Sequence, residues 1–568
     1  MQNKRFSLIV LSFLALFLFT LTACEPLDVP VEETVAVEDG TPVETVTPSP
    51  LPPTPSPTEV PLRVWLDPAL PLEIAEKVGF ALDTVERAIS PDEATIKLSV
   101  GSDDSGDLVS EWIYALAAPF ATVRDSISST EFVQFWQNGS PILGDAPNDL
   151  VMSESSFAAL SALYGEPLGK VSILPAEDLL ARSLEKSAWA VIPFESIEPQ
   201  WKIIHIDGQS PIQKAFDAES YPLSLPVSLS IDKAEVQDVN KLDEIEAQIR
   251  SAIPKTNREP EKLTTVILTG VTALTRATAT EMEIKGVLAP AESIGETMRE
   301  ADIAHVSNEV PFARDCPEPD WTQEIDLVFC SNDKYIDLLK EIGTDVVELT
   351  GDHFRDWGPE AMLHTLEISN EAGMDYFGGG KDIAEAKAPL KLEHNGNKIA
   401  FIGCNAKAPG YATASESNPG AYHCDFDYMV SEIQELKAEG YQVIATFQHD
   451  EIYLWEPEPN MREDFRKLAE AGATIVSGSQ AHQPHVYEFR GESFIHYGLG
   501  NLFFDQLGWY DDSDKAFLDR HVFYDGKYLG VELLTVQFFN WSTPTLMTEE
   551  ARSELLTRLF EYSQNLEQ

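Results

Sequence analysis

The chain has little positive charge for its length. Its 568 residues include 40 Lys and Arg against 94 Asp and Glu, and the formal net charge at pH 7 is -54. A surface of this sign repels the phosphates of nucleic acids, and it is also unsuited to lying flat on anionic lipid. We therefore expect no nucleic-acid partner.

Long apolar runs are also scarce, and the clearest one lies at the N-terminus. It extends from Phe6 to Phe19 and follows the basic residues Lys4 and Arg5. The run is shorter than the roughly 20 apolar residues that a transmembrane helix needs. Basic residues followed by a short apolar run are typical of a secretory signal peptide.

The apolar run is followed by residues 21–24, Leu-Thr-Ala-Cys, which resemble a bacterial lipobox. In such a sequence the cysteine becomes the lipidated N-terminus of the mature protein. We expect residues 1–24 to be a lipoprotein signal peptide with Cys24 as the lipidation site. The lipid would hold the protein at the extracytoplasmic face of the cell membrane. The alternative is an uncleaved membrane anchor with an incidental cysteine.

Cysteine is rare as well, with 5 in the whole chain. Apart from Cys24 these are Cys316, Cys330, Cys404 and Cys424. An even number of cysteines in an oxidising compartment indicates two disulfides, and the spacings do not fit a CxxC zinc knuckle. Of the three possible pairings, proximity in the sequence favours Cys316–Cys330 and Cys404–Cys424. Buried free thiols are the alternative.

The composition divides the rest of the chain into a linker and two larger regions. Residues 25–61 are rich in Pro, Thr, Val, Glu and Ser, which predicts an extended, solvated linker. In residues 62–255, helical patterns alternate with β-rich runs, which predicts an α/β domain. The helical patterns include Leu72 to Ala88, Leu108 to Ala117, and Phe157 to Leu163. The runs from Trp189 to Glu195 and Trp201 to Ile206 resemble the second lobe of a type II periplasmic solute-binding protein.

A second βα alternation begins near residue 262 and predicts a domain over residues 262–545, followed by a C-terminal helix in residues 546–568. Polar side chains gather directly after its predicted strands. In open α/β sheets, the carboxyl ends of the strands line the ligand crevice. Imidazoles and carboxylates gathered at such an edge suit a divalent transition metal, although a lone His at a strand end is usually a satisfied structural group. The residues expected at this edge are Glu309, Asp352, His353, His449, His482 and His485.

The order of these motifs resembles the capsule-synthesis CapA family, over roughly Leu263 to Gln506. Members of this family are linked to poly-γ-glutamate capsule synthesis or export. They belong with the calcineurin-like metallophosphoesterases, so the resemblance implies a sheet sandwich flanked by helices. The motifs that carry it are Asn308-Glu309, Asp352-His353 with Asp356-Trp357-Gly358, His449 near Glu451 and Tyr453, His482 with His485, and the run from Tyr497 to Asp505.

The resemblance also implies roles for single residues. By that resemblance His353 would act on the leaving group, as the general acid. From its position alone, Asp356 would orient the His353 imidazole, cap the helix expected near Pro359, or do both. Where the family has a metal-binding Asp after its first strand, this chain has Val271, which cannot bind a metal. One or two divalent ions (Mn, Fe or Zn) are therefore both open. The expected ligands are Glu309, Asp352, His449, His482 and His485.

Two functions follow from these expectations. The first is a metal-dependent hydrolase, similar to the phosphoesterases, that acts on a phosphate or amide of a cell-envelope polymer. The second is a non-catalytic binding or assembly lipoprotein with a degenerate metal site. In both, the expected partners are the membrane, through the lipid on Cys24, a capsule or other envelope polymer, and other membrane proteins of capsule synthesis.

Overall fold

The computed structural model describes residues 61–566, except residues 102–105, 142–148, 234–235, 237, 323–326, 408–409 and 411. The predicted signal peptide, Cys24 and the linker up to residue 60 lie outside the described residues. Residues 59–568 form one compact unit. None of the helices in the described part is both long and apolar enough to cross a bilayer.

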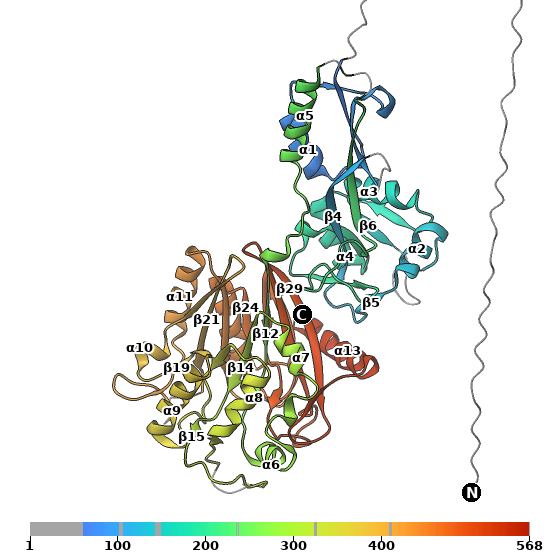
Figure 1. Ribbon diagram of the computed structural model, residues 1–568. Helices are drawn as coiled ribbons and strands as arrows, with labels where there is room; N and C mark the ends of the chain where they lie inside the picture. The colour runs from blue at the N-terminus through green and yellow to red at the C-terminus, as the bar shows by residue number, and fades with distance from the viewer. Residues whose placement is uncertain are drawn as a thin grey trace, which may run out of the picture. The chain divides into compact units, whose positions relative to one another are not determined.

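The N-terminal α/β domain is built around one twisted sheet (Figure 1). The helices that pack beside it are α1 (Leu72–Ala81), α2 (Ser129–Asn138), α3 (Glu154–Tyr164), α4 (Leu179–Lys186) and α5 (Val239–Ala252). In order across the sheet, the strands are β2 (Glu86–Arg87), β1 (Arg63–Leu66), β3 (Ile96–Val100), β11 (Ser224–Ile231), β4 (Asp107–Pro119), β8 (Trp189–Pro193), β6 (Leu150–Met152) and β7 (Val171–Ile173).

Two shorter pairings extend this domain. Strand β9 (Trp201–Ile203) pairs with the end of β4, and β10 (His205–Ile206) pairs with β5 (Ser126–Ile127) in a separate ladder. Local sequence explains where the neighbouring helix α2 begins, because Ser128 and Glu131 cap it reciprocally. It ends at Gly139, whose left-handed backbone suits a residue without a side chain.

One predicted helix of this domain is wrong. The segment from Leu108 to Ala117 lies in strand β4, between β11 and β8 at the centre of the sheet. From Trp112 to Ala118 every residue of the strand is buried. A strand covered on both faces is continuously apolar, and over this length periodicity cannot distinguish it from a buried helix. The pairing with β11 and β8 decides the conformation.

The C-terminal domain contains two sheets. The first has the order β18 (Asp375–Phe377), β17 (Val346–Glu348), β14 (Ile303–Asn308), β12 (Leu263–Leu268), β28 (Lys515–Tyr524), β29 (Lys527–Phe538) and β30 (Pro544–Leu546), with β13 (Val271–Thr272) and β27 (Asn501–Phe503) attached beside β14. The second has the order β20 (Leu390–His394), β21 (Asn397–Asn405), β23 (Gln442–Gln448), β24 (Ile475–Ser477), β26 (Ser493–His496) and β25 (Tyr487–Arg490). Short ladders join β15 (Phe312–Ala313) to β16 (Ser331–Asn332) and β19 (Gly379–Gly380) to β22 (Gly420–Ala421).

The two sheets pack face to face. Alternate residues of β12 show this, because Val266 and Leu268 belong to the core shared with the second sheet, whereas Ile267 belongs to a core on the opposite face. Phe401 of β21 stacks on His305 of β14, with ring centroids 6.0 Å apart. The predicted α/β class and sheet sandwich are confirmed.

Helices cover the outer faces of the sandwich (Figure 1). On the Ile267 side these are α6 (Arg276–Lys285), α7 (Gly295–Arg299), α8 (Ile336–Glu341) and α9 (Gly358–Glu371). The core shared with the second sheet includes buried residues of α11 (Phe426–Ala438), α12 (Pro459–Ala471) and α13 (Glu549–Asn565). The short helix α10 (Ile383–Ala386) lies beside β19.

Both predicted disulfides are present in the structure. Cys316 is bonded to Cys330, and Cys404 is bonded to Cys424. The second bond joins the end of β21 to the loop that leads into α11. The pairing that proximity in the sequence favours is therefore the one observed.

Candidate metal site at the strand ends

The carboxyl ends of strands from both sheets meet at one edge of the sandwich. Strands β14 and β17 are parallel neighbours in the first sheet, and β21, β23 and β24 are parallel neighbours in the second. Gln448, the last residue of β23, connects the sheets. Its Nε2 donates to Asp352 Oδ1 at 2.9 Å, and the backbone N–H of Asp352 donates to Gln448 Oε1 at 2.7 Å. This junction places the loops of the two sheets around a common site.

Glu309, Asp352 and His353 form the centre of this site. One ligand atom from each lies within 4.8 Å of the others. Glu309 is only 2% exposed, and its Oε2 has no hydrogen-bond partner among the described residues. Burial raises the pKa of Glu309, although the charges of His482 and His353 act in the opposite direction. A buried carboxylate oxygen without a partner is costly unless a cation or a proton neutralises it.

Asp352 and Glu451 share a lysine. The Nζ of Lys407 lies 2.6 Å from Asp352 Oδ2 and 2.6 Å from Glu451 Oε1. Burial alone would raise the pKa of Asp352, but the positive charges of His353 and Lys407 hold it below its usual value. Burial is likewise outweighed at Glu451, where His482 and Lys407 lower the pKa. Both carboxylates are therefore ionised at neutral pH.

His353 is held by a carboxylate behind it. Its Nδ1 lies 2.7 Å from Asp356 Oδ2, and that oxygen also accepts the backbone N–H of Phe329 at 2.7 Å. Burial would lower the pKa of His353, but the hydrogen bond to Asp356 and the charges of Glu309 and Asp352 raise it to about 9. The ring is thus an imidazolium at neutral pH in the metal-free protein.

His482 is also close to the acidic group. Its Nδ1 is 2.9 Å from Asn501 Oδ1, and its Nε2 is 4.0 Å from Glu451 Oε2. The amide nitrogen of Asn501 donates to the His482 carbonyl, which assigns the amide oxygen to face Nδ1. Nδ1 therefore donates to Asn501, and Nε2 faces Glu451.

The other two predicted histidine ligands are not members of the group of Glu309, Asp352 and His353, and both have protein partners of their own. The Nε2 of His449 pairs with Asp464 of α12 at 3.1 Å, and its Nδ1 accepts the backbone N–H of Asp450 at 2.8 Å. His485 is fully buried, its Nε2 bonds the carbonyl of Ile452 at 3.0 Å, and burial lowers its pKa to about 4. In this arrangement the ring nitrogens of His449 already have protein partners.

The structure thus brings together the predicted residues Glu309, Asp352, His353 and Asp356, with His482 close by. Metal binding by any of them stays a prediction. Lys407 was missed by sequence reasoning, because a lysine that follows a strand carries no signal of its own. In the sequence analysis Glu451 was named only as a neighbour of His449. Its position in the same loop, two residues after His449, could have indicated that it belongs to the site.

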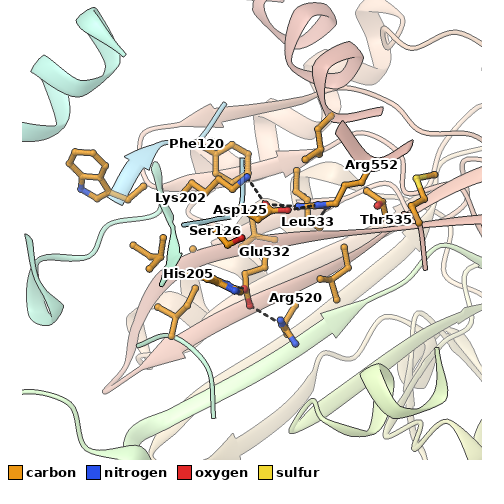
Figure 2. A pocket seen from close by; sticks show the side chains of 18 of the residues that line it. Phe120, Asp125, Ser126, Lys202, His205, Arg520, Glu532, Leu533, Thr535 and Arg552 are labelled. Atoms are coloured by element: carbon orange, nitrogen blue, oxygen red, sulfur yellow. Dashed lines mark hydrogen bonds and ion pairs between the residues drawn. The ribbon is translucent and has the colours of Figure 1, made fainter. Parts of the chain in front are cut away.

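A second, partly buried group of charges lies where the N-terminal domain meets β29 and α13. It lines a cavity of about 410 Å³ whose other walls are mostly apolar (Figure 2). Asp125 accepts from Arg552 Nε at 2.5 Å and from Arg552 Nη2 at 2.9 Å, and Lys202 Nζ lies 2.6 Å from it. These contacts tie Asp125 and Lys202 of the N-terminal domain to helix α13.

A parallel arrangement lies beside it in the same cavity (Figure 2). Glu532 of β29 pairs with His205 at 3.1 Å and accepts from Arg520 Nε at 2.8 Å. Burial would raise the pKa of Glu532, but the charges of Arg520 and His205 lower it to about 2. Each carboxylate of this group has cationic partners, so the group joins the two domains rather than presenting a free ligand atom.

The fold and the site together define an α/β sandwich with an acidic and histidine-containing cluster at its strand ends. Residues 265–506, which carry this cluster, match the family model described as bacterial capsule synthesis protein PGA_cap. The C-terminal domain is therefore similar to the capsule-synthesis family that its motifs resemble. The matched residues include neither the N-terminal domain nor strands β28 to β30 and helix α13.

Relatives among curated proteins agree with this match. The chain is 27% identical over 199 residues to the capsule biosynthesis protein CapA of Bacillus anthracis, covering 34% of this chain and 47% of that protein. It is 29% identical over 198 residues to the PGA biosynthesis protein CapA of Bacillus subtilis (strain 168), covering 34% and 50%. The chain thus spans about half the length of the curated relatives it matches.

Solved structures with partial similarity include proteins of two kinds. A 5'-nucleotidase precursor from Thermus thermophilus is 14% identical with a TM-score of 0.31, covering 54% of this chain and 59% of that one. An ABC-type phosphate transport receptor from Vibrio cholerae is 12% identical with a TM-score of 0.27, covering 33% and 93%.

Proposed function

We propose that this protein is a metal-dependent hydrolase of capsule synthesis or export, anchored through Cys24 at the outer face of the membrane. Its substrate would be a phosphate- or amide-linked polymer of the cell envelope, with poly-γ-glutamate as the leading candidate. Similarity of residues 265–506 to the capsule synthesis family supports the process. The observation that carries the chemistry is the buried, unpartnered Oε2 of Glu309 beside Asp352 and His353.

The donor set fits a divalent cation. Carboxylate and imidazole groups are the ligands that Mn, Fe and Zn take in proteins, and a cation would neutralise the buried Glu309. Glu309 and Asp352 are the residues that would hold it, and His482 Nε2 lies 4.0 Å from Glu451 Oε2 nearby. When bound, such an ion lowers the pKa of water and polarises the bond to be cleaved.

The other residues of the site would position the substrate and move the proton. His353 would donate its Nε2 proton to the leaving group, since Asp356 holds Nδ1 and thereby fixes the ring. Phe329 packs against the His353 ring at a centroid distance of 4.7 Å, which excludes water from one side of it. Lys407 offers positive charge beside Asp352, where an anionic substrate would approach.

The test combines metal analysis with turnover. The purified protein should hold about one divalent ion per chain and hydrolyse a chromogenic phosphodiester. Glu309→Gln should reduce the rate at least about 100-fold, as loss of a group essential to the transition state does. Glu439→Gln, at an exposed pair with Lys391, is the matched control and should leave the rate unchanged. Absence of both metal and turnover in the wild-type protein would refute the proposal.

A second candidate function is binding or assembly without turnover. It is favoured by Val271, which is fully buried in an apolar cluster, and by Lys407, whose ammonium already contacts two of the carboxylates. Under this reading the protein binds metal but does not cleave the phosphodiester, and deleting its gene reduces capsule staining of the cells. An unchanged capsule would contradict it.

A further inference from the structure

Lys407 occupies the space between two carboxylates of the candidate metal site. Its Nζ is 2.6 Å from Asp352 Oδ2 and 2.6 Å from Glu451 Oε1. The side chains of all three residues are less than one-third exposed. An ammonium in this position contacts oxygens that would otherwise be open to a metal ion.

The backbone of Lys407 is fixed by the same junction that joins the two sheets. Its N–H donates to Asn405 Oδ1 at 2.9 Å. The Nδ2 of Asn405 donates to the carbonyl of Thr350 and to Gln448 Oε1, both at 2.7 Å. Asn405 thus ties the loop after β21 to the loop after β17 and to the end of β23. The lysine is therefore held at the site by its chain, and its contacts are not those of a free surface side chain.

The side chains around Lys407 include metal-ligand atoms suited to a second cation. Glu451 contributes a carboxylate, and Asp352, which Lys407 also contacts, is grouped with Glu309. His482 offers Nε2 at 4.0 Å from Glu451 Oε2, while Asn501 holds its Nδ1. Two ligand atoms at this separation can share one ion, because metal–ligand distances are about 2.0 to 2.2 Å.

We propose that the ammonium of Lys407 takes the place of a second metal ion, so that the site holds one divalent cation at Glu309 and Asp352. This inference rests on the proposed metal-dependent function and specifies the composition of its site. An ammonium 2.6 Å from both oxygens leaves no room for an ion that needs the same oxygens at about 2.1 Å. Removing the ammonium exposes Asp352, Glu451 and His482 as a second donor set.

The missing ligand points the same way. Val271 stands where the family has a metal-binding Asp, and it has no carboxylate to offer a second ion. The ammonium of Lys407 contacts the two carboxylates that such an ion would share. The lysine thus takes the place of an ion for which the chain lacks a ligand.

The experiment counts bound ions and does not depend on activity. The metal-free protein is titrated with Mn²⁺ alone, and stoichiometry is measured by calorimetry and by elemental analysis after dialysis. We expect one ion in the wild type and two in Lys407→Met, which keeps the length of the side chain but removes its charge. Lys391→Met is the matched control, because Lys391 pairs with Glu439 on the surface, and it should bind one ion.

Further variants test the donor set and guard against loss of folding. The double variant Lys407→Met with Glu451→Gln should return to one ion, because Glu451 is the ligand that the second ion needs. If thermal unfolding shows that Lys407→Met does not fold, Lys407→Gln, whose amide still donates to a carboxylate, should also bind two ions.

The outcomes separate this inference from the function on which it rests. One ion in both the wild type and the lysine variants overturns the role of Lys407 and leaves the metal site standing. Two ions in the wild type also overturn it. No ion in any variant overturns the metal site itself, and the inference about Lys407 with it.

Discussion

The protein buries charge in two regions, and it balances that charge differently in each. In the interdomain cavity, Asp125 is bonded to Arg552 and Lys202, and Glu532 is bonded to Arg520 and His205 (Figure 2). In the site at the strand ends, Glu309 keeps a buried oxygen without a hydrogen-bond partner in the described part of the chain. The first arrangement is complete and stabilises the contact between domains. The second is incomplete, and this incompleteness is what points to a bound cation.

The largest expected effect lies in the paired region. Glu532→Gln removes the charge that holds both Arg520 and His205. Breaking a buried ion pair on one side leaves the partners uncompensated, so we expect a loss of about 3 kcal/mol in the free energy of unfolding at pH 7. Glu439→Gln, at an exposed pair, should cost less than about 1 kcal/mol. Chemical denaturation measures both losses. Equal losses would show that the ion pairs in the cavity stabilise the protein no more than an exposed pair does.

The pairing of Glu532 with Arg520 and His205 also predicts that the free energy of unfolding depends on pH. The pKa of Glu532 is lowered to about 2 in the folded protein. A carboxyl with a depressed folded pKa contributes stability that is present above its unfolded value of about 4.3 and is lost as pH falls toward 2. The difference in stability between wild type and Glu532→Gln should therefore shrink from about 3 kcal/mol at pH 7 as the pH falls below about 4.3. A difference that stays constant down to about pH 3 would contradict it.

Glu309 should respond in the opposite sense, and its response should reverse with metal. Without metal its pKa is raised by burial, so the charged form is disfavoured in the folded state. In chelator, Glu309→Gln should be more stable than wild type by about 1 kcal/mol. With Mn²⁺ at about 100 times its dissociation constant, wild type should gain about 2.7 kcal/mol and the variant almost none. Thermal unfolding with and without Mn²⁺ measures this, and a variant that gains as much as wild type would exclude Glu309 as a ligand.

The smallest effect concerns His353. Asp356→Asn keeps the shape of the side chain but removes the negative charge that faces Nδ1. The pKa of His353, about 9 in the metal-free protein, should fall by at least about one unit. An NMR titration of the imidazole in chelator measures the change. An unaltered pKa would mean that Glu309 and Asp352 alone keep His353 protonated.

Much of the C-terminal fold was predictable because its strands are short apolar runs between helices with clear periodicity. The alternation expected from near residue 262 begins with β12 (Leu263–Leu268), and the helix expected in residues 546–568 is α13 (Glu549–Asn565). Both disulfide pairs were also predictable, since each closes a short loop. The failure at β4 came from a strand that is buried on both faces and therefore shows no alternation.

The site was predictable only in part. That polar residues at strand ends would meet follows from the topology of parallel strands, and Glu309, Asp352 and His353 do meet. The orientation of His449 was beyond this reasoning, because it depends on Asp464 of α12, a helix that begins ten residues later in the chain. The proposed ligand roles of His449 and His485 remain predictions, to be tested by metal binding of their alanine variants.

What the sequence alone determined is the class of the C-terminal domain, the pairing of its cysteines and the edge at which its polar residues gather. Each of these depends on local pattern or on proximity along the chain. Only the tertiary structure showed which charges are neutralised. Asp125 and Arg552 are 427 positions apart, and Asp352 and Lys407 are 55 apart. Such pairings arise from the packing of sheets and domains, because the energy of a buried charge depends on the partners that folding brings beside it.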